Sequence, residues 1–155
     1  MINAVSALLI VLSVLLIVVA VGDIRTRIIP NWLNGAIALL AIPFWFALGL
    51  GPQAILIQIG LSCTVLAVFA ACFAIGMMGG GDVKLLAALA LWLPFGNMLS
   101  LLVWMALAGG VLTLVMLVLK RIRKTTERLE VPYGVAISAA ALLLVANDIL
   151  TTPGA

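Results

Sequence analysis

Two aspartates stand alone in a strongly apolar sequence. Asp23 and Asp82 are the only acidic residues before position 127, and each lies beside an apolar run. A carboxylate at membrane depth is costly, so it usually pairs with another group or faces water. Two carboxylates within a few ångströms cannot both ionise easily, and one then holds the proton that the other lacks. Such a pair can activate a water as base while it protonates an amide carbonyl as acid.

The same acids allow other interpretations. Asp82 at the start of a helix would meet the helix dipole favourably, and Asp23 could pair with Arg25 or Arg27. A small ion- or proton-coupled transporter subunit would use the acids as a relay, whereas an assembly scaffold would need neither. A transporter is expected to carry acids near mid-membrane or on both faces of a pathway. Both candidates here lie at one predicted face, which favours the catalytic interpretation.

The composition excludes a soluble domain. The chain has 155 residues, of which 66% are hydrophobic and 8% charged, whereas soluble domains carry roughly 25% charged residues. It contains no histidine, which removes histidine-based acid–base catalysis and imidazole metal ligation. Cys63 and Cys72 are expected to be small packing residues and not metal ligands. We therefore expect an all-α polytopic membrane protein, one transmembrane domain over residues 1–155, with no cofactor or metal.

Apolar runs and helix breakers predict six transmembrane helices. The breakers are the segment before Pro30 and Asn31, the turn at Gly49–Gln53, the glycine run, the segment Pro94–Asn97 and the charged segment 120–130. The expected spans cover about residues 2–21, 32–50, 54–78, 83–93, 98–119 and 131–150.

The basic residues decide whether the stretch 83–119 crosses once or twice. Arg25, Arg27, Lys84 and five further basic residues within 120–128 all belong on the cytoplasmic side by the positive-inside rule. They share that side only if 83–119 crosses twice, which places both termini outside the cytoplasm. At about 1.5 Å per residue this stretch reaches about 55 Å, slightly short for two crossings of about 30 Å each. We therefore expect Asp82 to lie slightly below the headgroups.

This topology also sorts the acids. Asp23 and Asp82 fall at the cytoplasmic face, whereas Asp148 falls at the opposite face, about one membrane thickness away. Glu127 and Glu130 lie among basic residues and are expected to be surface charge.

The segment "GGGD" contains Gly79, Gly80 and Gly81 directly before Asp82. Three glycines can form a flexible loop, or they can let an extended substrate backbone approach the acid with no Cβ in the way. A helical amide is hydrogen-bonded and sterically covered, so a substrate must be unwound before it is cut. The segment "EVPYGVA" begins the last span at the same face, where a proline in the first turn is ordinary.

Two longer segments resemble a known family. "GDIRTRIIPNWLN" and "GGGDVKLLAALALWLP" resemble the two signature segments of type IV prepilin peptidases, the GxGD class of intramembrane aspartyl proteases. In that class the first segment has an aspartate followed by isoleucine-proline-asparagine, and the second reads GxGDxK. The "PYG" at Pro132–Gly134 resembles a third segment near the active site.

The resemblance implies that Asp23 and Asp82 are the catalytic pair. It implies a substrate-binding role for the glycine loop and the other matching residues, which are Gly79, Gly80, Gly81, Lys84, Pro132, Tyr133 and Gly134. Such enzymes remove the leader from prepilins at the cytoplasmic face of a bacterial or archaeal membrane, just before the hydrophobic helix. Partners would be prepilins, pilin-like proteins and the lipid bilayer, with no nucleic acid.

The sequence departs from the bifunctional members of this class in one respect. Those members carry paired CxxC zinc motifs and methylate the new N-terminus, whereas this sequence has no CxxC. We therefore expect cleavage without methylation. The short form resembles the tight-adherence (Flp-type) pilus subgroup.

Overall fold

Six helices make up the part of the chain that the structure describes. The computed structural model describes residues 3–123 and 133–151. The helices are α1 (Ala4–Thr26), α2 (Asn31–Ala47), α3 (Pro52–Ala74), α4 (Gly80–Leu89), α5 (Phe95–Arg123) and α6 (Tyr133–Thr151). The all-helical fold and the number of helices are therefore as the sequence predicts.

The ends of the first helices follow from local sequence signals. The side chain of Asn3 accepts a hydrogen bond from the N–H of Ser6 at 2.8 Å and caps the start of α1. Arg27, with φ of 57°, ends α1 in the left-handed conformation. Pro30 precedes α2, and Pro52 opens α3 in the first turn, where its missing N–H costs nothing.

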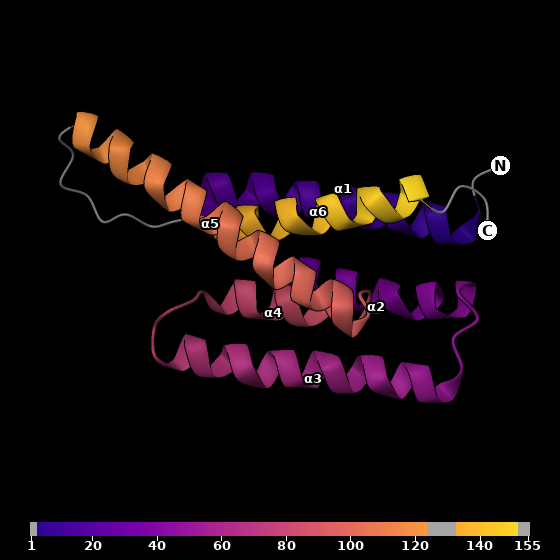
Figure 1. Ribbon diagram of the computed structural model, residues 1–155. Helices are drawn as coiled ribbons and strands as arrows, with labels where there is room; N and C mark the ends of the chain where they lie inside the picture. Colours follow the sequence, from indigo (N-terminus) through magenta and orange to yellow (C-terminus); the bar gives the residue numbers. More distant parts are fainter. Residues whose placement is uncertain (1–2, 124–132, 152–155) are drawn as a thin grey trace.

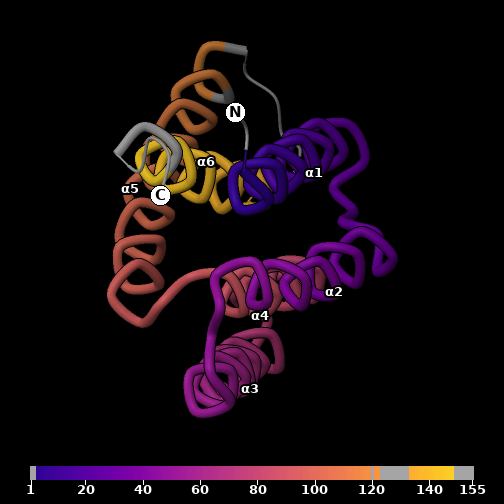
Figure 2. Tube along the Cα trace, turned by 90° about the vertical axis from the view of Figure 1, so that its right-hand side faces the viewer, coloured from indigo at the N-terminus to yellow at the C-terminus, as the bar shows by residue number. Residues whose placement is uncertain are grey.

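The helices form two groups, α1 with α5 and α6, and α2 with α3 and α4. α1 packs against α6 and α2, and α5 packs against α6, while α3 and α2 pack against α4 (Figure 1). The end-on view places α4 between α3 and the α1/α6 pair (Figure 2). The two groups are joined by the contact of α1 with α2 and by that of α4 with α6.

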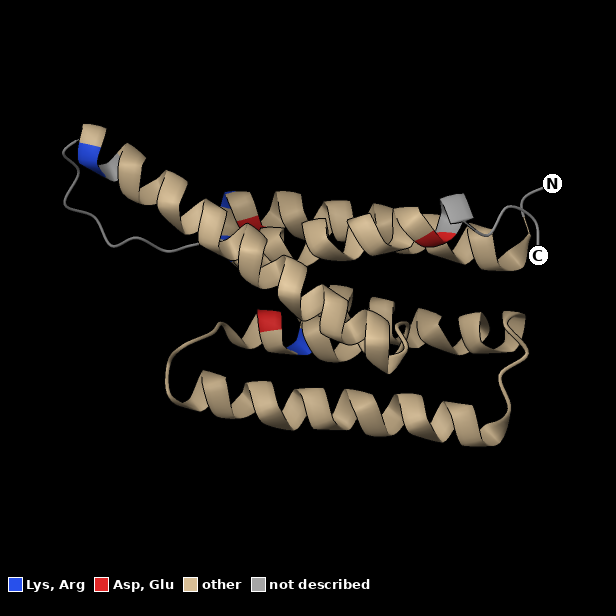
Figure 3. Ribbon diagram, viewed as in Figure 1, with Lys and Arg blue, Asp and Glu red and all other residues tan. Residues whose placement is uncertain are grey.

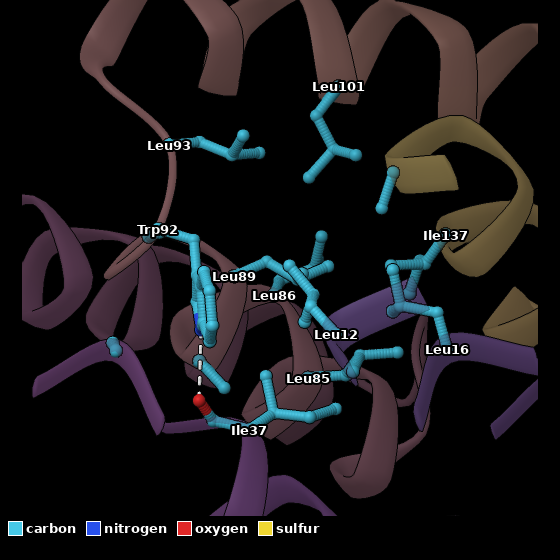
Figure 4. Close-up of a cluster of buried hydrophobic side chains, with 14 of the residues drawn as sticks. Leu12, Leu16, Ile37, Leu85, Leu86, Leu89, Trp92, Leu93, Leu101 and Ile137 are labelled. Atoms are coloured by element: carbon cyan, nitrogen blue, oxygen red, sulfur yellow. Dashed lines mark hydrogen bonds between the residues drawn. The ribbon is translucent and has the colours of Figure 1, made fainter. Parts of the chain in front are cut away.

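The buried core gathers around α4. Leu85, Leu86 and Leu89 of α4 are almost completely buried and meet Leu12 and Leu16 of α1 in one cluster. Figure 4 shows this cluster together with residues of α2, α5 and α6. α4 is therefore held by apolar contacts over most of its surface, which fixes its position among the helices.

α4 is much shorter than a membrane crossing. Its 10 residues reach about 15 Å, roughly half the apolar thickness of a bilayer. The sequence predicts a span over 83–93, but the helix ends at Leu89 and a turn follows inside the bundle. In the structure this part of the chain divides into a short α4 and a long α5 of 29 residues.

Side chains of α2 and α3 bind the carbonyl groups at the end of α4. The Trp45 indole N–H donates to the carbonyl of Leu91 at 2.7 Å, and the Gln58 amide donates to the carbonyls of Leu91 and Leu93. The Ser62 hydroxyl donates to the carbonyl of Ala87 at 2.7 Å. Free carbonyls at a helix end are costly in an apolar environment, so these donors allow α4 to end inside the bundle.

Three of the described helices have the length and apolarity of a membrane span. They are α1, α3 and the segment Phe95–Leu119 of α5, and shorter apolar helices cover Asn31–Ala47 and Tyr133–Asp148. The observed helix bounds differ from the expected spans by a few residues at most ends. The largest difference is at α1, which continues through Asp23 to Thr26, and the ends of α3, α4 and α5 each differ by four residues.

Charged side chains separate along the bundle. The acids of α1 and α4 and the basic residues drawn on α1, α4 and α5 lie toward one end (Figure 3). The acid of α6 lies toward the other end, where α1 begins and α6 ends. Asp148 is therefore remote from Asp23 and Asp82, as the sequence predicts.

Candidate active site

Asp23 lies near the C-terminal end of α1 and caps the start of α6. Its side chain is 5% exposed, and its Oδ2 accepts a hydrogen bond from the N–H of Val135 at 3.1 Å. The N–H of Gly134 also interacts with this carboxylate. The first N–H groups of a helix have no partner within the helix, and a negative charge is favourable there. Asp23 therefore fixes α6 against α1.

Gly134 allows α6 to approach this carboxylate. A Cβ at Gly134 would lie 2.9 Å from the Cγ and Oδ2 of Asp23 and 2.9 Å from the Cδ1 of Ile29. Real Cβ contacts essentially never become that short, so any larger residue would displace the carboxylate or the helix. Gly134 thus has a steric reason to be glycine that only the contact between α1 and α6 reveals.

Asp82 lies in the first turn of α4, ahead of the apolar stretch that begins at Val83. Burial, and after it the negative charge of Asp23, raise the pKa of the Asp82 carboxyl to about 6, against the opposing effect of the backbone N–H of Gly79. A negative charge on one of these carboxyls opposes ionisation of the other. They therefore form one coupled acidic site.

A cavity of about 400 Å³ contains both carboxylates. Its lining comes from the end of α1, the α3–α4 connection and the starts of α4 and α6. The residues are Asp23, Arg27, Gly76, Met77, Met78, Gly79, Asp82 and Tyr133. A space of this size, with two interacting acids in its wall, can admit a short extended peptide segment and a water. It can therefore support acid–base chemistry on an amide.

The glycines beside Asp82 occupy different environments. Gly79 lines the cavity, and a Cβ there would lie 2.9 Å from the Oδ2 of Asp82. A Cβ at Gly80 would lie 3.3 Å from the ring of Phe73, and one at Gly81 would lie 3.1 Å from the Cβ of Ile29. Close packing against Phe73 and Ile29 therefore explains why positions 80 and 81 are glycine. Of the three glycines, only Gly79 lines the cavity.

The other residues expected to bind substrate are divided between two places. Tyr133 lines the cavity with the aspartates. Lys84 instead donates a hydrogen bond to the Oδ1 of Asn31 at 2.7 Å and lines a separate slot between α2, α3 and α4. Pro132 lies outside the described residues.

Asn34 is a residue of this region that the sequence interpretation missed. Its side chain is 4% exposed, and its Nδ2 donates to the carbonyl of Gly81, directly before Asp82, at 3.2 Å. Its Oδ1 is buried with no hydrogen-bond partner among the described residues. The available signal was an asparagine one turn inside an apolar helix, where an unpaired amide is costly. Asn34 therefore connects α2 to the backbone that carries Asp82.

Replacing Asn34 by leucine tests this connection. Asn34→Leu keeps the approximate volume but leaves the carbonyl of Gly81 without its donor, so the backbone before Asp82 loses a restraint. In an assay of amide cleavage, the reaction that the sequence predicts, we expect kcat to fall about tenfold with little change in KM. The matched control is Asn97→Leu, at a half-buried asparagine in a different pocket that also contains Asp148. An unchanged kcat for Asn34→Leu would remove the positioning role.

The structure thus places two acids in one cavity of an apolar helical bundle. The sequence matches the Type IV leader peptidase family over residues 10–114. The chain belongs to this family, and its general role is that of a leader peptidase acting on prepilins. The matched range includes both aspartates but ends before Tyr133 and Gly134. No curated protein and no solved structure matches the chain.

Proposed function

We propose that the chain is an aspartyl endopeptidase in which Asp23 and Asp82 are the catalytic pair. The observation that carries this proposal is the shared cavity, in which the charge of Asp23 contributes to the raised pKa of Asp82. Family membership supports a proteolytic role for this site. The remaining residues of the cavity are one arginine, one tyrosine, two methionines and two glycines, so the acids are the groups suited to general acid–base catalysis.

The two carboxyls have distinct roles in the proposed reaction. Ionised Asp23, which receives backbone N–H hydrogen bonds, removes a proton from a water, and the oxygen of that water bonds to the scissile carbonyl carbon. Protonated Asp82 gives its proton to the carbonyl oxygen, which produces a neutral gem-diol. The C–N bond then breaks, the proton on Asp23 passes to the leaving nitrogen, and a diol proton returns to Asp82.

We propose that this reaction takes place at the cytoplasmic face of a bacterial or archaeal cytoplasmic membrane. The proposal includes six membrane crossings with both termini outside the cytoplasm. The concentration of basic residues at the end that carries the aspartates supports it. The depth at which α4 ends is compatible with a crossing completed by the turn before α5, because side chains bind the carbonyls there.

We further propose that the substrates are Flp-type prepilins and pilin-like proteins, and that this chain does not methylate the product. The support is the two signature segments and the absence of a CxxC in the sequence. Co-expression with a Flp-type prepilin tests the proposal by gel shift and by the intact mass of the product. We expect loss of the leader and an unmethylated N-terminus, with no shift when the peptidase is omitted. An uncut prepilin would overturn the substrate assignment, and a product heavier by one methyl group would overturn cleavage without methylation.

A further inference from the structure

An apolar groove of about 430 Å³ runs between α5 and α6. The wall from α5 includes Trp104, Leu107 and Val111, and the wall from α6 includes Ala139 and Leu143. Every residue that lines this α5/α6 groove is apolar. Its volume is sufficient for a row of two or three large aliphatic side chains. The groove is therefore suited to a helix that is itself apolar on the contacting face.

The groove leads to the candidate active site. Val135 lines the groove, and its backbone N–H donates to Asp23 at 3.1 Å. Tyr133 lines the cavity that contains both aspartates, and its ring lies 3.3 Å from the position that a Cβ would take at Gly109 of α5. The end of the groove near Val135 thus adjoins the wall of the cavity.

We propose that the α5/α6 groove binds the N-terminal turns of the apolar helix of a prepilin substrate. This proposal rests on the proposed function, in which the cut falls just before that helix. From Val135 to Leu143 the groove extends about 12 Å along α6, or about two helical turns. When the substrate helix begins level with Val135 in the groove, the extended substrate residues that precede the helix lie beside Asp23. Binding in the groove therefore sets which peptide bond reaches the acids.

The second slot near the site is chemically less suited to an apolar helix. It lies between α2, α3 and α4 and contains Asn31, Asn34, Ser62 and Lys84. An apolar helix placed there would remove the exposed ammonium of Lys84 from water without offering it a new partner, which is costly. In the α5/α6 groove the same helix exchanges lipid contacts for close packing against small residues, which is how membrane helices associate.

Site-specific photo-crosslinking tests the location directly. A photoreactive amino acid replaces Ala139 in the groove, Leu66 in the second slot or Ala67 on α3, all of which are exposed in the bundle. Each is combined with Asp82→Asn, so that prepilin is bound without being cut. We expect a crosslink to prepilin from position 139 at least about five times stronger than from positions 66 and 67. A crosslink chiefly from position 66, or to a second copy of this chain from position 139, would overturn the proposal.

Filling the groove gives a kinetic test. Ala139→Phe, at an exposed position, is expected to raise the KM for full-length prepilin about tenfold. It should leave unchanged the cleavage of a short peptide that spans the cut site but lacks the helix. The matched control Ala67→Phe, on the exposed face of α3, should change neither the KM for prepilin nor the cleavage of the short peptide. Equal slowing of prepilin and peptide would indicate a damaged site and overturn the docking role, as would wild-type kinetics for prepilin.

The two proposals can fail separately. If the wild type cuts prepilin and Ala139→Phe cuts it equally well, the groove proposal fails and the proposed function stands. If the wild type cuts neither prepilin nor the short peptide, the proposed function itself fails. A melting temperature in detergent within a few degrees of the wild type confirms that Ala139→Phe is folded.

Discussion

Asp23→Asn and Asp82→Asn are each expected to reduce the kcat for prepilin cleavage by at least about 1,000-fold. Both substitutions keep the size of the side chain and one acceptor oxygen, but neither amide can exchange the proton that the reaction requires. Asp23→Asn retains an oxygen for the Val135 N–H, which lies 3.1 Å from the carboxylate in the wild type. The loss therefore reports on chemistry more than on the packing of α6. Initial rates with purified enzyme in detergent provide the measurement.

The stability of Asp82→Asn distinguishes lost chemistry from misfolding. The pKa of Asp82 is raised from 3.8 to about 6, so between these values the folded protein binds more protons than the unfolded chain. Wild-type stability consequently decreases as pH rises from about 4 to about 6 and stays lower above that range. Asparagine does not titrate. The variant should be more stable than the wild type above pH 6, by about 1–2 kcal/mol after allowance for partial solvent screening.

This stability difference should disappear below about pH 4, where Asp82 is protonated in both the folded and the unfolded wild type. Thermal melts of the two proteins across this range provide the comparison. An inactive Asp82→Asn that is also less stable than the wild type at every pH would indicate a structural role for Asp82. If an Asn variant at either position cuts prepilin at the wild-type rate, the proposal that Asp23 and Asp82 are the catalytic pair is wrong.

Gly134→Ala is expected to lower kcat/KM about 100-fold. The added Cβ would lie 2.9 Å from the Cγ and Oδ2 of Asp23 and 2.9 Å from the Cδ1 of Ile29. Relief of these contacts must move the Asp23 carboxylate or the start of α6. A displacement of about 1 Å within a catalytic site can cost about 100-fold in rate. Steady-state kinetics on prepilin and a melting temperature in detergent measure the two consequences.

Gly60→Ala is the matched control for Gly134→Ala. Gly60 lies within α3, and a Cβ there meets nothing within 4 Å. Alanine is also a better helix former than glycine by about 1 kcal/mol, so this variant should keep its activity and gain slightly in stability. If Gly134→Ala performed as well as Gly60→Ala, the close contact between α6 and Asp23 would have no functional importance.

Much of the fold could be predicted from the sequence, because the signals are local. Apolar runs separated by proline, glycine and charged segments predict six helices in the order that the structure shows. The distribution of basic residues places Asp23 and Asp82 at one end of the bundle and Asp148 at the other, as Figure 3 shows. Each of these inferences needs only the residue types within a segment and the order of the segments along the chain.

The length of α4 could not be predicted in the same way. The apolar residues from Val83 to Leu93 look like one continuous helix in sequence, yet the helix ends at Leu89. The ending is supported by Trp45 and Gln58, which donate to the carbonyl of Leu91. These donors come from helices more than 30 positions away in the chain, and nothing in the local sequence of α4 indicates them.

The sequence by itself determined the two acids, the six helices and the end of the bundle at which the acids lie. Only the tertiary structure decided what surrounds each acid. Asp23 binds the N–H of Val135, 112 positions away, and Asn34 binds the carbonyl before Asp82, 47 positions away. Residue type and spacing indicate which groups must avoid lipid, but they do not indicate which distant backbone atom satisfies each group. That choice depends on how the helices pack around α4.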